Sequence, residues 1–171
     1  RLGLVVNPDA GLGGKLGFKG SDGRAAEARA AGAEDRAGPR MAQCLSHLVT
    51  LVASSLNRTN VRLELVVWEG RMGGAWVPEL DADSPVSVRS VGSTPSTTTP
   101  EDTTRLVGDL LESGVEAIVY AGGDGTTRDI VNALEAAGTE AKKTAVIGVP
   151  GGVKMHSGCF ATTPKACLLY T

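Results

Sequence analysis

Short runs of apolar residues recur along the chain and alternate with segments of helical periodicity. The four clearest runs are Leu2–Val6, Val61–Trp68, Val115–Ala121 and Ala145–Val149. Each is rich in valine and is followed closely by glycine, proline or asparagine, a pattern typical of buried strands. A further strand is expected at Val86–Val91, inside a stretch rich in Ser, Thr and Pro (81–99) that is otherwise expected to be an exposed loop.

Between these runs, apolar residues spaced three and four positions apart predict helices with one buried face. The clearest is Arg40–Asn57, with Pro39 in its first turn. Its apolar face consists of Met41, Cys44, Leu45, Leu48, Val52 and Leu56. A second helix is expected to begin at Thr99-Pro100, where threonine can cap and proline suits the first position, and to end at Gly114.

Two further segments have helical character. A helix with Ile130, Val131 and Leu134 on its inner face follows Gly122–Thr126 and is expected to stop at Gly138. The Ala-rich segment 24–38 has good helix propensity but a weak apolar face. Its charged residues are therefore expected to form a solvated surface.

This alternation of strands and helices predicts an α/β fold, with a mostly parallel sheet covered by helices on both faces. Ligands of such sheets bind in the crevice beyond the carboxyl ends of the strands. Glycine clusters follow three of the predicted strands, at Asn7–Gly14, Gly122–Gly125 and Pro150–Gly152. We therefore expect three loops to converge on one crevice.

Composition narrows the class of protein. Glycine accounts for 23 of the 171 residues, about 13%, which is nearly twice the usual share of roughly 7%. A net charge of −2 and 4% aromatic residues argue against a nucleic-acid binder. No apolar run reaches the roughly 18 residues of a membrane span. The three cysteines form no CxxC pair, so we expect neither a disulfide framework nor a zinc ribbon, and a cytoplasmic location.

The loop Gly122-Gly123-Asp124-Gly125-Thr126 carries the strongest candidate chemistry. Its glycines allow a sharp turn and close approach to a ligand, and the helix that follows presents a positive end suited to phosphate. A carboxylate there would repel phosphate, unless Asp124 binds Mg²⁺ or takes a proton from an acceptor hydroxyl. The alternative is an aspartate that fixes a tight turn by local hydrogen bonds.

The loop Asn7–Lys15 (NPDAGLGGK) is the second candidate. Lys15 is suited to neutralise phosphate charge, and Asn7 to hydrogen-bond across to the Asp124 loop. The spacing matches neither a Walker A loop nor a dinucleotide fingerprint, and a turn without function is the alternative. After Pro150–Gly152, the residues Lys154, His156 and Ser157 lie near the expected crevice, where ligand contact and a structural role remain open.

Together, GGDGT and the upstream NPDAGLGGK loop resemble the superfamily of NAD kinases and diacylglycerol- or sphingosine-type lipid kinases. Two stretches resemble its ATP-NAD kinase/AcoX-like branch, residues 148–164 (GVPGGVKMHSGCFATTP) and Lys19–Gly23. Lipid kinases would show a PxGTGND-like loop near Pro150, which is absent. Pro150-Gly151-Gly152 departs slightly from the Pro-Ala-Gly expected in the branch.

The resemblance implies a Rossmann-like fold and phosphoryl transfer from ATP, or polyphosphate, to the 2′-hydroxyl of NAD, with Mg²⁺ bridging phosphate oxygens. Asp124 would activate the acceptor as the catalytic residue; no metal ligand is assigned. The residues implied in nucleotide and phosphate binding are Asn7, Gly11, Gly13, Gly14, Lys15, Gly122, Gly123, Gly125, Thr126 and Lys154. The partners expected are small nucleotides, with no nucleic acid and no membrane; monomer or homo-oligomer is left open.

The resemblance also sets the expected domain organisation. Residues 1–171 would form a single α/β kinase domain, and the superfamily's β-rich C-terminal domain, which takes part in dinucleotide binding, would lie beyond them. We expect residues 1–171 alone to have little activity without it. The alternatives are a lipid kinase of the same superfamily and a non-catalytic, nucleotide-sensing AcoX-like module.

Overall fold

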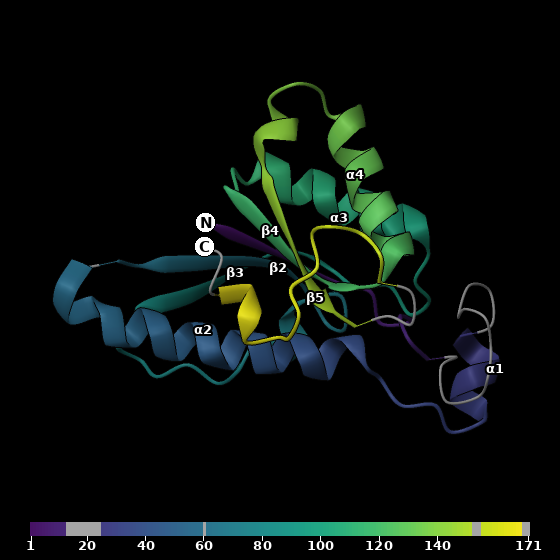
Figure 1. The fold of residues 1–171 in the computed structure, drawn as a ribbon, viewed down its shortest axis with the longest axis horizontal. Helices are drawn as coiled ribbons and strands as arrows, with labels where there is room; N and C mark the ends of the chain where they lie inside the picture. The colour runs from purple at the N-terminus through teal and green to yellow at the C-terminus, as the bar shows by residue number, and fades with distance from the viewer. Residues whose placement is uncertain (13–24, 60, 152–154, 169–171) are drawn as a thin grey trace.

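The computed structural model describes residues 1–12, 25–59, 61–151 and 155–168 of the chain (Figure 1). The strands are β1 (Leu2–Val6), β2 (Leu63–Glu69), β3 (Val86–Ser93), β4 (Ala117–Gly122) and β5 (Ala145–Pro150). The α-helices are α1 (Ala25–Ala30), α2 (Ala37–Thr59), α3 (Pro100–Glu112) and α4 (Asp124–Ala136). Short 3₁₀ turns are η1 (Gly74–Trp76), η2 (Ala141–Lys143) and η3 (Ala166–Leu168).

The strands form one sheet in the order β3-β2-β1-β4-β5, and every pairing among them is parallel. The register is regular from β1 to β5; for example, Leu4 pairs with Val119, which pairs with Ile147. Because the strands are parallel, their carboxyl ends lie at one edge of the sheet. The predicted α/β, Rossmann-like architecture is confirmed.

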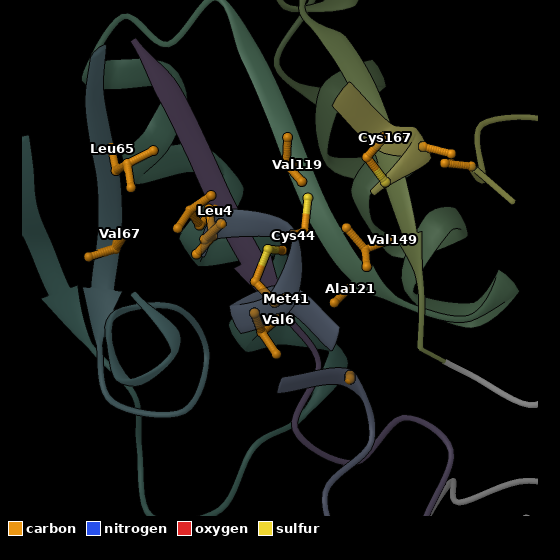
Figure 2. Packing of buried hydrophobic residues seen from close by; sticks show 14 of the residues in the cluster. Leu4, Val6, Met41, Cys44, Leu65, Val67, Val119, Ala121, Val149 and Cys167 are labelled. Atoms are coloured by element: carbon orange, nitrogen blue, oxygen red, sulfur yellow. The ribbon is translucent and has the colours of Figure 1, made fainter. Parts of the chain in front are cut away.

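Helices cover both faces of the sheet (Figure 1). Beneath one face lies α2, whose Met41, Cys44 and Leu45 are buried against Leu4 and Val6 of β1 and their neighbours (Figure 2). The opposite face packs against α3 and α4. Successive residues of a strand point to opposite faces, which explains why β1, β4 and β5 consist almost wholly of apolar residues and glycine, whereas the edge strand β3 also carries polar residues.

Element boundaries differ from the predictions where capping and tertiary contacts override periodicity. The α2 helix starts at Ala37, so Pro39 does lie in its first turn, and continues to Thr59 rather than ending at Asn57. Of the segment 24–38, which was expected to have helical character, Ala25–Ala30 form the short α1, and residues 37 and 38 begin α2. The strand expected at Val86–Val91 is present as β3, which extends two residues further, to Ser93, and forms an edge of the sheet; the rest of the 81–99 region contains no helix or strand, as expected.

The start of α3 agrees with the prediction in detail. The amide of Thr99 donates a hydrogen bond to the Asp102 carboxylate at 2.8 Å, and Pro100 is the first helical residue. The helix ends before Gly114, which has a φ of +70°. No helix among the described residues is long and apolar enough to cross a membrane.

Leu110 of α3 is fully buried, and its side chain occupies the space beside Gly3 of β1 where a Cβ atom would otherwise lie. Truncation in Leu110→Ala is expected to lower the free energy of unfolding by about 2–5 kcal/mol, because a cavity remains beneath the helix. Urea unfolding followed by circular dichroism measures the change. The matched control Val131→Ala, at a 42% exposed site on α4, is expected to change it by less than about 0.5 kcal/mol.

Candidate functional site

The three glycine-rich loops meet at the carboxyl edge of the sheet, as predicted. The backbone amide of Asn7 donates to Ala121 O at 3.0 Å, which joins the end of β1 to the end of β4. The Gly151 amide donates to Gly122 O at 3.0 Å, which joins the end of β5 to β4. The parallel pairing with β4 therefore continues one residue beyond β1 and one residue beyond β5, at the crevice.

Asn7 also bonds across the crevice through its side chain. Its Nδ2 donates to Thr126 Oγ1 at 3.0 Å, so the structure contains the link expected between Asn7 and the Asp124 loop. Its Oδ1 accepts from the amide of Asp9 at 3.0 Å. Both polar ends of this amide are thus used, and Asn7 fixes the first loop against the start of α4.

Close backbone approach explains two of the predicted glycines. Gly11 has a φ of +81°, and a Cβ atom at this position would lie 2.7 Å from Gly151 O. A Cβ atom at Gly122 would overlap the Thr126 side chain. Gly11 therefore needs to be glycine for the first and third loops to meet, and Gly122 for its own turn to pack against Thr126. At Gly125, by contrast, a Cβ atom would enter open space.

Asp124 is the first residue of α4, and its carboxylate faces the segment that follows β5. Oδ1 accepts hydrogen bonds from the amide of His156 at 2.8 Å, the amide of Ser157 at 2.9 Å and the Ser157 hydroxyl at 2.7 Å. Oδ2 accepts one bond, from the His156 amide at 3.1 Å. Figure 1 shows this yellow segment beside the start of α4. We call this arrangement the Asp124 clamp.

The clamp lowers the pKa of the Asp124 carboxyl. The Ser157 hydroxyl contributes most, followed by the Ser157 and His156 amides, because each donor stabilises the charged form. The carboxylate is therefore ionised at neutral pH. Its contribution to stability is present above the ordinary carboxyl pKa of about 3.9 and is lost as the pH falls through the lowered value.

Four predicted binding residues, Gly13, Gly14, Lys15 and Lys154, lie outside the described residues, as does the Lys19–Gly23 stretch. The others lie together at the crevice: Asn7, Gly11, Gly122, Gly123, Asp124, Gly125 and Thr126. His156 and Ser157, left open by the sequence, contact the candidate catalytic residue directly. Their spacing from Asp124 along the chain gave no signal of this contact.

Arg29 corrects the expectation that the charges of 24–38 are simply a solvated surface. Its guanidinium donates to Asp9 Oδ1 at 2.8 Å, to Pro8 O at 2.9 Å and to Asp35 Oδ1 at 2.9 Å. Asp35 also pairs with Arg71 at 2.6 Å. This network ties α1 to the loop after β1. Asp9 and Arg71 are 20 residues or more from their partners in the network, so no local pattern could reveal these contacts.

A cleft of about 300 Å³ lies beside the first glycine-rich loop. Its lining includes Gly11 and Leu12 of that loop, Arg36, and Arg40 of α2. The Arg40 guanidinium donates to Pro150 O at 2.8 Å, so the cleft adjoins the end of β5. Among the described residues, no three His, Cys, Asp or Glu side chains gather as a metal-binding group.

The wholly parallel sheet, with helices on both faces, defines an α/β protein of the Rossmann-like class. The chain matches the family model of the ATP-NAD kinase N-terminal domain over residues 2–168. It therefore belongs to this family. No curated protein and no solved structure shows significant similarity to the chain.

The clamp predicts a measurable titration. Removing the hydroxyl donor in Ser157→Ala is expected to raise the pKa of the Asp124 carboxyl toward its ordinary value of about 3.9, and carbon-13 NMR of the carboxyl group would follow it. Ser157→Thr keeps a hydroxyl and is expected to keep the lowered pKa. An identical titration in the alanine variant and the wild type would contradict the hydrogen bond between Ser157 and Asp124.

Proposed function

We propose that this protein is an NAD kinase-like phosphotransferase, which transfers a phosphoryl group from ATP or polyphosphate to the 2′-hydroxyl of NAD. Membership of the ATP-NAD kinase family supports the reaction class. One observation carries the assignment of the site: an ionised Asp124 is held at the start of α4, where the three loops meet.

The first part of the chemistry is phosphate binding. The start of α4 carries the positive end of the helix dipole, and a Cβ atom at Gly125 would enter open space. Gly122, Gly123 and Thr126 shape the turn, while Asn7 holds Thr126 in place. We infer that the donor's phosphates occupy this edge, with Gly11, Gly13, Gly14, Lys15 and Lys154 contributing from the two flanking loops.

The second part is acceptor activation. Asp124 Oδ1 has three donors, whereas Oδ2 has one longer hydrogen bond and is the oxygen better placed to accept a further proton. A carboxylate with a lowered pKa is a weak base, so its main effect is to orient the acceptor hydroxyl and receive its proton as the phosphoryl group transfers. Positioning is the dominant contribution in such reactions.

Magnesium fits this arrangement as a companion of the donor's phosphates. Mg²⁺ usually keeps several waters and binds substrate phosphates with few protein ligands, so the absence of a three-residue metal group among the described residues is compatible with it. When bound, it would neutralise charge on the phosphate oxygens. No residue described here is assigned as its ligand.

Two other functions follow from the same family relationship. A lipid kinase would phosphorylate diacylglycerol instead of NAD, and assays with both acceptors side by side separate the two. A nucleotide sensor of the AcoX-like kind would bind nucleotide in calorimetry without transferring phosphate. NAD kinase activity is favoured, because residues 148–164 resemble the ATP-NAD kinase branch. Small nucleotides, rather than nucleic acids or membranes, are the proposed partners.

Asp124→Asn in the full-length protein is expected to lower kcat by about 10²–10⁴-fold, because the amide cannot accept the acceptor's proton. ATP or polyphosphate labelled in its terminal phosphate, together with NAD and Mg²⁺, gives labelled NADP as the readout. Asp83→Asn, at an exposed position away from the crevice, is the matched control and is expected to retain wild-type turnover. Equal rates in the Asp124 variant and the wild type would refute the assigned role.

A further inference from the structure

Beneath the Asp124 clamp lies Tyr120, a fully buried residue of β4 that the proposed reaction does not use. Its hydroxyl forms a hydrogen bond with Thr127 Oγ1, in the first turn of α4. The same hydroxyl lies 3.1 Å from Cys159 Sγ, in the segment after β5. Tyr120 thus contacts both of the elements that the clamp joins.

Each contact lies close to a clamp residue. Thr127 is three residues after Asp124, and its amide and hydroxyl both donate to Gly123 O, at 3.0 and 3.2 Å. Cys159 is two residues after Ser157, and its carbonyl accepts from the Gly148 amide at 2.8 Å. The hydroxyl of Tyr120 therefore links the start of α4 to the segment that supplies the donors of the Asp124 clamp.

The ring of Tyr120 supports the same segment. It packs against Phe160, with ring centroids 5.5 Å apart and planes tilted by 53°. Both rings lie over Gly148 of β5, where a Cβ atom would be 2.6 Å from Phe160 and 2.8 Å from the Tyr120 hydroxyl. Glycine at this position leaves the space that the aromatic pair and the bridging hydroxyl occupy.

We propose that Tyr120 is a positioning residue, whose hydroxyl sets the distance between Asp124 and the donors of His156 and Ser157. This inference rests on the proposed phosphotransferase function for its effect on turnover, but not for its effect on the clamp. Tyr120 does not exchange protons in the reaction. Burial, with a smaller effect from Cys159, raises the pKa of its phenol above the ordinary value, so it remains protonated.

Amide hydrogen exchange tests the effect on the clamp directly. In Tyr120→Phe, which keeps the ring and removes only the hydroxyl, the His156 and Ser157 amides are expected to lose about tenfold in protection, the scale of one hydrogen bond. Amides of β1 and α3 are expected to keep theirs. Ser113→Ala is the matched control, because it removes a hydroxyl that bonds Asp109 O at the far end of α3.

A second pair of variants tests the bridge from its other side. Thr127→Val removes the hydroxyl partner and is expected to reproduce the loss of protection. Thr127→Ser retains a hydroxyl and is expected to keep the wild-type protection. In full-length enzyme, Tyr120→Phe is expected to lower kcat about tenfold to a hundredfold, as misplacement of a catalytic group does. KM for the phosphoryl donor is expected to change little.

The outcomes separate the two hypotheses. Faster exchange in Tyr120→Phe at the His156 and Ser157 amides alone would support the role of Tyr120 in positioning Asp124. If the wild-type enzyme then transferred no phosphate, the proposed function would be overturned while the positioning role stood. Unchanged protection at both amides would overturn the positioning role. An equal loss of protection across the core would also overturn it, because Tyr120 would then be only a contributor to global stability.

Discussion

Parallel strand pairing is the constraint on which the rest of this structure depends. Because all pairings in the described sheet are parallel, β1, β4 and β5 must end at the same edge. Their following loops then compete for one small region, and hydrogen bonds such as Gly151 N to Gly122 O hold them there. Glycine at Gly11 is a consequence of this crowding, since a Cβ atom there would lie 2.7 Å from Gly151 O of the neighbouring loop.

The fold could be predicted from the sequence because its signals are local. Apolar runs such as Leu2–Val6 became strands, and the Thr99-Pro100 start and Gly114 stop bounded α3 as expected. The errors fall where local signals are weak. Segment 24–38 has helix-forming residues but little apolar surface, so only six of its residues form α1. Strand β3 extends beyond its apolar run because pairing with β2 stabilises it.

The candidate site was only partly predictable. Convergence of the loops follows from topology, and the link between Asn7 and the Asp124 loop follows from that convergence. The partners of Asp124 could not be predicted, because a segment more than thirty residues away supplies them. They are two backbone amides, which every sequence contains, and one serine hydroxyl. Tyr120 is similarly hidden, since a tyrosine in an apolar strand differs little in pattern from a core residue.

Asp9 and Asp124 follow β1 and β4 at the carboxyl edge of the sheet, and their partners distinguish them. Asp9 is neutralised by Arg29, and its second oxygen accepts from Thr98 at 3.2 Å. Asp124 belongs to none of the ion pairs formed by Lys or Arg among the described residues; amides and one hydroxyl hold it instead. Dipoles of this kind stabilise a charge without cancelling it. Of the two, Asp124 therefore retains the net negative charge that the proposed function requires, while the charge of Asp9 is used to hold α1 against the loop after β1.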